Sequence, residues 1–185
     1  MPAYALIAGD LLGAQDRWDQ AAEAYRRAAN LEFGEATALR LFGALRRANR
    51  LDEAGSVLDL LGAQHPRNVA AALLASDAAL AVGQWRAAEA LLQDVRRRSG
   101  DRDAVLLNNL GWARLNLGQA AQAVGLGQAA YALAPNNAAV TASYGWFLAR
   151  SGMRERGAAL LEKAVALAPD VPVYATRLAE VRAKR

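Results

Sequence analysis

Two tryptophans in the second half of the chain stand in the same local setting. Trp112 and Trp146 each directly follow a glycine, and they lie 34 residues apart. A tryptophan ring offers a large apolar area and a face that attracts cations, so such a pair is suited to binding a protein segment. The regular spacing indicates a structural repeat. Within a repeat, the two rings either line one surface side by side or pack edgewise against the neighbouring helix.

The sequence contains no set of residues arranged for catalysis or metal binding. His65 is the single histidine and cysteine is absent, which excludes a His/Cys metal cluster and a Cys–His nucleophile pair. A phosphate-binding loop of the GK[ST] type is absent too. The adjacent carboxylates Asp52 and Glu53 fit the first turn of a helix, where the dipole favours negative charge. We therefore predict a protein that is not an enzyme and uses no cofactor and no metal.

The composition favours one mainly helical domain. The chain has 185 residues, a usual length for a domain that buries its own core. Hydrophobic residues make up 54% of it, and Ala and Leu dominate them, which favours helix over strand. The net charge of +4 is ordinary. The densest basic stretches, residues 46–50 and 96–102, close predicted helices and contain no aromatics, so the sequence argues against nucleic-acid binding.

Internal repetition organises the chain into five units. Small residues recur at intervals of 33, 34, 35 and 34, at Ala21, Ala54, Ala88, Ala123 and Gly157. Five residues before each of them stands a residue that tolerates a tight turn: Asp16, Asn49, Gly83, Gly118 and Gly152. Twelve residues after them stand Phe33, Pro66, Gly100, Pro135 and Pro169, where a second helix would end. Each unit is therefore predicted to be a helix, a turn and a second helix.

These units are predicted to form a single array over residues 2–185. The expected units are 2–34, 35–68, 69–102, 104–137 and 138–171, followed by a terminal helix at 172–184. The terminal segment places Val173, Tyr174, Leu178 and Val181 on an apolar side. It is read either as a capping helix for the last pair or as the first helix of a sixth unit in a longer, truncated array.

The pattern resembles the tetratricopeptide repeat (TPR). The fourth unit carries Leu107, Leu110-Gly111, Ala123 and Pro135, and the first carries Gly9, Ala21, Tyr25 and Ala28. The departures from the pattern are Phe42, Ser76, Gly127 and Gly157. The resemblance implies an all-α fold, a right-handed α-solenoid of five TPR-like helix pairs plus a C-terminal capping helix. It also implies a concave face that binds a peptide or protein segment, the role of a protein-protein interaction scaffold.

A finer resemblance concerns residues 106–172. This run is similar to the C-terminal repeats of bacterial TPR lipoproteins associated with exosortase and exopolysaccharide loci. Those proteins are longer and carry a lipidated N-terminal signal, whereas this chain has neither a lipoprotein cysteine nor a secretory signal. The resemblance implies a fragment or a shortened relative of such a protein. The chain is expected to be soluble, cytoplasmic as given and periplasmic if it is such a fragment.

The resemblance and the helical phase together suggest a lining for the concave face. The candidate residues are Arg40, Arg46, Arg47, Asp77, Asn108, Trp112, Asn116, Trp146 and Arg150. In this set arginine can grip carboxylates, asparagine can bond a peptide backbone, and the tryptophans are the expected apolar anchors. The clamp of Lys/Arg and Asn that some TPR domains use for a C-terminal carboxylate is not expected, because its basic members are missing. Self-assembly through exposed solenoid ends is the remaining alternative, and the sequence does not identify the partner, the compartment or the oligomeric state.

Overall fold

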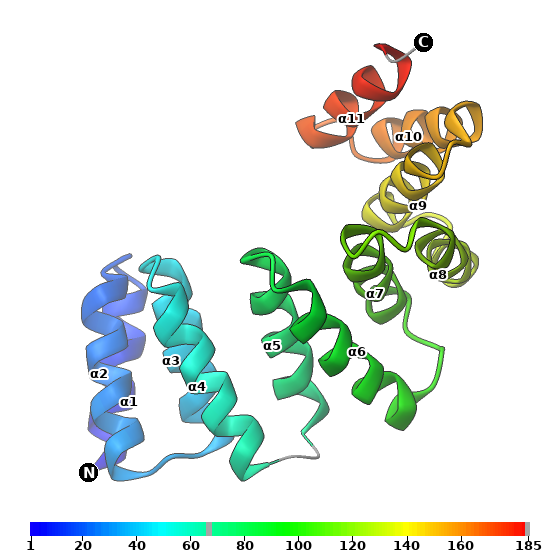
Figure 1. The fold of residues 1–185 in the computed structure, drawn as a ribbon. Coiled ribbons are helices and arrows are strands. Elements are labelled where there is room, and N and C mark those ends of the chain that lie inside the picture. Colours follow the sequence, from blue (N-terminus) through cyan, green and yellow to red (C-terminus); the bar gives the residue numbers. More distant parts are fainter. Residues whose placement is uncertain (66–67, 184–185) are drawn as a thin grey trace. The chain divides into compact units, whose positions relative to one another are not determined.

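The computed structural model describes residues 1–65 and 68–183, and all the regular structure in these ranges is α-helical (Figure 1). The helices are α1 (Pro2–Gly13), α2 (Trp18–Leu31), α3 (Glu35–Arg47), α4 (Leu51–Gln64), α5 (Val69–Ala81), α6 (Trp85–Ser99), α7 (Ala104–Asn116), α8 (Ala120–Leu133), α9 (Ala138–Arg150), α10 (Arg154–Leu167) and α11 (Pro172–Ala183). Pro66 and the last residue of the predicted terminal helix lie outside the described residues. The all-α prediction is confirmed.

The tight turns between helices fall where the repeat pattern places them. Asp16 and Asn49 adopt φ angles of 56° and 59°, and they are followed by α2 and α4. Gly83, Gly118 and Gly152 have φ angles of 76°, 79° and 96° at the equivalent places. These angles lie in the left-handed region, which glycine enters without strain and which Asn and Asp tolerate better than other residues. The residue types at the five turns therefore match the backbone that each turn requires.

Polar side chains fix the beginnings of several helices that come first in their pairs. The Asp103 carboxylate accepts hydrogen bonds from the backbone N–H groups of Val105 (2.8 Å) and Leu106 (3.1 Å) at the start of α7. The Asn137 side chain accepts one from Val140 N–H (3.1 Å) at the start of α9. Each such cap stabilises its helix by about 1 kcal/mol, because it satisfies donors that have no partner within the helix.

The helices divide into two compact units, Met1–Ala79 and Leu80–Arg185. In the first unit, α1 packs on α2, α2 on α3 and α3 on α4. Their shared core is formed by buried side chains that include Tyr25, Leu41, Phe42, Leu45 and Leu58. Phe42, which departs from the small residue of the TPR pattern, is buried in this core and fills it.

In the second unit, two glycines that depart from the TPR pattern have clear packing roles. A Cβ at Gly127 would lie 2.8 Å from the ring of Phe147 and 3.0 Å from that of Tyr144, so these rings of α9 occupy the space of the missing aromatic. A Cβ at Gly157 would lie 2.5 Å from the carbonyl oxygen of Gly145. The backbones of α9 and α10 therefore approach too closely for any side chain at this point.

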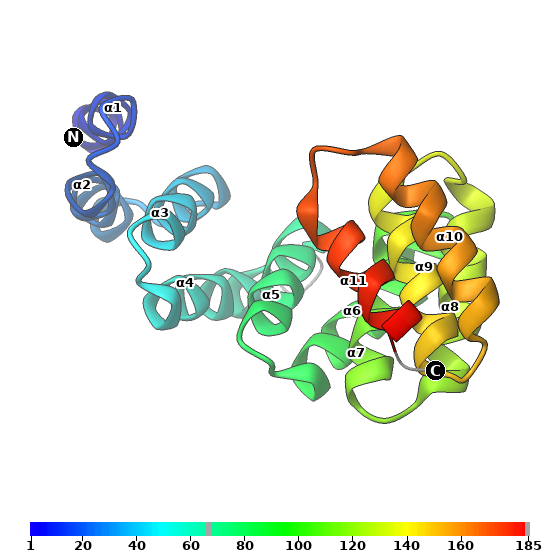
Figure 2. The same ribbon diagram turned by 90° about the horizontal axis from the view of Figure 1, so that it is seen from above.

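The terminal helix α11 covers the apolar side of the last pair. It lies against α10 and also contacts α9 (Figure 2). Tyr174, Leu178 and Val181 pack on a core of Ala142, Leu161 and Ala164, and this part of the capping prediction is confirmed. Val173 contributes little to the cover because 44% of it is exposed.

Candidate functional site

The Trp112 ring of α7 is held by the neighbouring helix α9. Its indole N–H donates a 2.9 Å hydrogen bond to the hydroxyl of Ser143, which is buried. The ring also meets Phe147 edge to face, with centroids 5.1 Å apart and planes at 77°. Trp112 is half-buried. Both contacts fix the orientation of the ring, since edge-to-face packing and a bonded N–H each favour one geometry.

The guanidinium of Arg177 in α11 lies over both tryptophan rings. Its central carbon is 4.7 Å from the centroid of Trp112 and 5.6 Å from that of Trp146. A second cation, Arg150, lies 5.8 Å from the Trp146 centroid. Trp146 is half-buried, whereas Arg150 is exposed. Helices α7, α9 and α11 thus meet in a cluster of two aromatic rings and two guanidinium groups, which we call the Trp–Arg cluster (Trp112, Trp146, Arg150 and Arg177).

The charge of Arg177 is only partly balanced by its surroundings. Burial lowers the pKa of Arg177, while the nearby Tyr174 and Glu180 act in the opposite direction. Within the described residues, no carboxylate lies within ion-pair distance of Arg177 or Arg150. Cation–π attraction to the rings is therefore the main interaction that holds both guanidinium groups.

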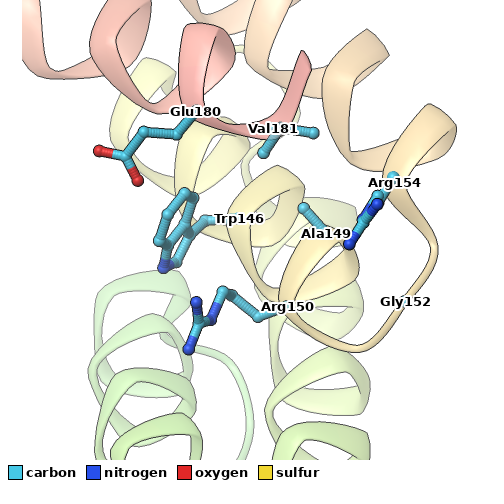
Figure 3. A pocket seen from close by; sticks show the side chains of 7 residues that line it. All are labelled: Trp146, Ala149, Arg150, Gly152, Arg154, Glu180 and Val181. Carbon is cyan, nitrogen blue, oxygen red and sulfur yellow. The ribbon is translucent and has the colours of Figure 1, made fainter. Parts of the chain in front are cut away.

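A small pocket opens beside Trp146 (Figure 3). Its volume is about 220 Å³. The lining residues come from α9, the α9–α10 turn, α10 and α11: Trp146, Ala149, Arg150, Gly152, Arg154, Glu180 and Val181. In Figure 3 the Trp146 ring stands between the Arg150 side chain and that of Glu180. The pocket therefore combines an aromatic wall with charges of both signs.

The two asparagines of the predicted lining make mostly local contacts. The Asn116 side chain donates a 2.9 Å hydrogen bond to the Trp112 carbonyl oxygen, one turn earlier in α7. The Asn108 amide donates a long, 3.4 Å bond to Asn109. The buried side-chain oxygen of Asn108 has no hydrogen-bond partner among the described residues. Asn116 thus turns back on its own helix, and Asn108 keeps one unused acceptor.

The four candidates in Met1–Ala79 make contacts within that unit. Arg40 forms a 3.3 Å ion pair with Asp10, which also accepts a 2.7 Å bond from the Tyr25 hydroxyl. Burial and Asp10 together raise the pKa of Tyr25 to about 12. These groups link α1, α2 and α3 through one carboxylate, so Arg40 has a structural partner.

The other three candidates of this unit are Arg46, Arg47 and Asp77. Arg47 lies 4.5 Å from the Trp18 centroid, and Arg46 lies 5.5 Å from that of Phe42. Burial raises the pKa of Asp77, and the charge of Arg46 opposes that shift. The structure thus joins Trp112, Trp146 and Arg150 in one cluster, and it gives the first-unit arginines separate partners.

Sequence reasoning missed the residue that joins the two tryptophans. Arg177 lies 34 residues after Ser143, just as Trp146 lies 34 residues after Trp112. Ser143 bonds to the tryptophan of the unit before it, and Arg177 contacts the tryptophan of the unit before it as well. The 34-residue spacing, continued into the terminal helix, is therefore the sequence signal that could have identified Arg177.

The described residues were also compared with the requirements of a metal site and of a membrane-spanning helix. Over residues 1–65 and 68–183, no three His, Cys, Asp or Glu side chains gather in a way that could hold a metal ion. In the same ranges, none of the helices combines the length and the apolar character needed to cross a bilayer.

Comparison with solved structures identifies the fold. A crystal structure of TTC0263, described as a thermophilic TPR protein from Thermus thermophilus, aligns with a TM-score of 0.72 and 21% identity over 98% of each chain. The MamA protein aligns with a TM-score of 0.76 and 17% identity over 94% of each chain. A double mutant of MamA RS-1 reaches 0.80 with 18% identity, covering 91% of this chain and 95% of the other. The chain therefore has the TPR fold, and the prediction of a helical TPR solenoid is confirmed.

Sequence comparisons add nothing to this result. No protein-family model matches the chain, and none of the curated proteins matches it. Identities of 17–21% to the solved structures establish the fold alone. The function is therefore inferred from the site.

Proposed function

We propose that the protein is a non-catalytic scaffold that binds a protein or peptide segment on the surface formed by α7, α9 and α11 in Leu80–Arg185. The pocket beside Trp146 is the observation that carries this proposal. Its lining combines an aromatic ring, exposed cationic side chains and a carboxylate. Tryptophan and arginine are the residue types that contribute most to binding energy at protein interfaces. The TPR fold, whose repeats present extended binding surfaces, supports the same role.

The size of the pocket favours a side chain of a protein partner over a free small molecule. Sites for drug-sized ligands usually enclose about 300–1,000 Å³. The pocket at Trp146 has about 220 Å³. It can receive one side chain of a segment whose remaining residues lie along the neighbouring helices. In this proposal, the bound segment also contacts the residues predicted to line the binding face in Leu80–Arg185, namely Asn108, Trp112, Asn116 and Arg150.

Peptide selection on the intact chain tests this proposal. Peptides selected from a random-sequence display library should bind the wild-type protein and lose affinity at least about tenfold with Trp146→Ala, because that change removes about 1.4 kcal/mol or more of contact energy. Arg156→Ala is the matched control, since Arg156 is exposed on α10 and lies outside the pocket. Unchanged affinity in a folded Trp146→Ala protein would refute the proposed site.

A second candidate function, self-association, rests on α1. Tyr4, Ile7 and Leu11 form one stripe of this helix and are 74%, 65% and 62% exposed. At the positions equivalent to Tyr4 and Leu11, later first helices carry buried side chains, for example Leu106 and Ala113 in α7. This stripe can pair with its own copy in antiparallel orientation. A contact centred between Ile7 and Ala8 would place Tyr4 against Leu11 without opposing like charges.

Sedimentation at several concentrations tests this second function. If α1 pairs with a second copy, the wild-type mass should rise with concentration, and Ile7→Glu should remain monomeric because it buries an unpaired charge in the contact. Leu133→Glu is the control, since Leu133 is a 48% exposed leucine on α8 and not on α1. A wild-type protein that stays monomeric at every concentration would exclude this function.

A further inference from the structure

Arg177 carries a positive charge into a place where none of the carboxylates in residues 1–65 and 68–183 pairs with it. Its guanidinium lies against the rings of Trp112 and Trp146, and it is half-buried. A guanidinium group has five N–H donors in a planar fork. Aromatic faces attract the charge, but they accept none of these hydrogen bonds in the way an oxygen does. Within the described residues Arg177 makes no hydrogen bond or ion pair, so its donors are available.

Several other arginines of the same unit are paired with carboxylates. Arg96 binds Asp101 through two bonds of 2.5 and 2.7 Å, Arg114 binds Glu89 at 2.5 Å, and Arg182 binds Glu162. Arg150 resembles Arg177 instead, because its contact within the described residues is the Trp146 ring. Two guanidinium groups thus lie on one ring, and no carboxylate from the part of the chain that the structure describes is bound to either. Like charges at such a place repel each other, and a bound anion would relieve this repulsion.

The acidic residue whose charge acts on Arg177 does not fill this role. Glu180 lines the pocket at Trp146 and attracts Arg177, yet it does not come within ion-pair distance. Burial makes the charged form of Arg177 less favourable, and an incoming carboxylate would offset that cost. The segment Leu80–Arg185 also contains 14 Lys and Arg against eight Asp and Glu, so its field attracts anions over a longer range.

We propose that Arg177 and Arg150 form a carboxylate-binding site beside Trp146, which receives an Asp or Glu side chain of the bound protein segment. The inference rests on the proposed function and names the chemistry of the ligand. The site differs from the Lys/Arg and Asn clamp considered in the sequence analysis, because its cations come from α9 and the terminal helix α11 and lie on tryptophan rings. It does not require the end of a polypeptide.

An acidic stretch suits the site better than a single terminal carboxylate. The two cations have different surroundings: Arg177 is half-buried between two rings, and Arg150 is exposed on one. They belong to different helices and act as two separate points of attachment. A segment with more than one acidic side chain can reach both points while its backbone passes over Trp146.

Competitive binding measurements on the full chain test this inference. Peptides selected on the wild-type protein from a random-sequence library should be enriched in Asp and Glu. Their affinity, measured with acetylated and amidated synthetic peptides, should fall at least about tenfold with Arg177→Met and with Arg150→Gln. Arg156→Gln removes the same charge outside the pocket and should change affinity less than about twofold. The methionine in Arg177→Met keeps an apolar side chain against the two rings, which preserves the packing of α11.

The outcomes separate this inference from the proposed function. Selected peptides that lack acidic residues, yet bind through Trp146, would overturn the carboxylate site and leave the scaffold function standing. Binding that requires a free C-terminus would overturn the choice of a side-chain carboxylate. If the Arg177→Met protein does not fold, Arg177→Lys and Arg150→Gln are compared with wild type instead. Unchanged peptide affinity in both variants would refute the inference. Weaker binding in both would support it. A failure to select any peptide that depends on Trp146 would count against both proposals.

Discussion

The ion-pair network of Arg26 and Arg50 in the first unit and the Trp–Arg cluster in the second hold their arginines in different ways. In Met1–Ala79, Arg50 binds Glu53 through two bonds of 2.7 and 2.9 Å and also binds Glu23 at 2.9 Å, while Arg26 binds Glu53 at 2.5 Å. In Leu80–Arg185, the arginines of the Trp–Arg cluster lie on aromatic rings, and no carboxylate up to residue 183 pairs with them. The first arrangement satisfies its charges internally and joins α2 to α4. The second leaves cationic donors available to an outside group, which is what a binding site requires.

The contrast extends to the contacts between successive first helices. In the first unit, α1 and α3 are linked by the Asp10–Arg40 ion pair, whose side chains are 52% and 44% exposed. In the second, α7 and α9 are linked by the contact of the half-buried Trp112 ring with the buried side chains of Ser143 and Phe147. Exposed ion pairs contribute little to stability, whereas buried aromatic contacts contribute more.

The largest effect is expected at the aromatic link. Trp112→Phe removes the indole N–H and leaves the buried Ser143 hydroxyl without its donor, at a cost of about 1–2 kcal/mol in the free energy of unfolding. Adding Ser143→Ala should recover part of this loss, and chemical denaturation of the four members of the mutant cycle measures the coupling. Additive losses would show that the bond does not link α7 to α9.

The stabilisation that Glu53 provides through its bonds to Arg26 and Arg50 in the first unit should depend on pH. Hydrogen bonds from Arg50 and Arg26 lower the pKa of Glu53 from 4.5 to about 2. Because the folded pKa lies below the unfolded one, the stabilisation is fully present above about pH 4.5 and disappears as the pH falls toward 2. Thermal midpoints of wild type and Glu53→Gln should therefore differ near neutral pH and converge in acid. A constant difference across this range would contradict the assignment, and Glu32→Gln serves as an exposed control.

The smallest effect is expected for the exposed cations. Arg40→Gln should cost about 0.2–1 kcal/mol, since it breaks an exposed ion pair with Asp10. Arg150→Gln should leave stability within about 0.5 kcal/mol of wild type, because Arg150 has no carboxylate partner within the described residues. Denaturant titration compares the two variants. A larger loss for Arg150→Gln would indicate that the Trp–Arg cluster is structural and would weaken its role in binding.

The sequence predicted the fold well because the repeat makes each position visible five times. The glycines and Asn49 identified the turns, and small residues such as Ala123 marked the close contacts between helices. The candidate site was harder to predict from the sequence, because the orientation of Trp112 depends on Ser143 and Phe147 in the next unit. Arg177 lies in the terminal segment, where the sequence analysis identified only apolar residues as contacts, and its two tryptophan contacts depend on how α11 packs.

Photo-cross-linking at the pocket tests the central claim most directly. A photoreactive phenylalanine analogue in place of Glu180, which lines the pocket, is compared with the same analogue in place of Glu155, an exposed residue of α10 outside it. With a peptide selected on the wild-type protein, the account predicts efficient cross-linking from position 180, little from position 155, and loss of the product when Trp146→Ala is added. Equal cross-linking from both positions, or a product that persists without Trp146, would contradict the claim that this pocket binds the partner.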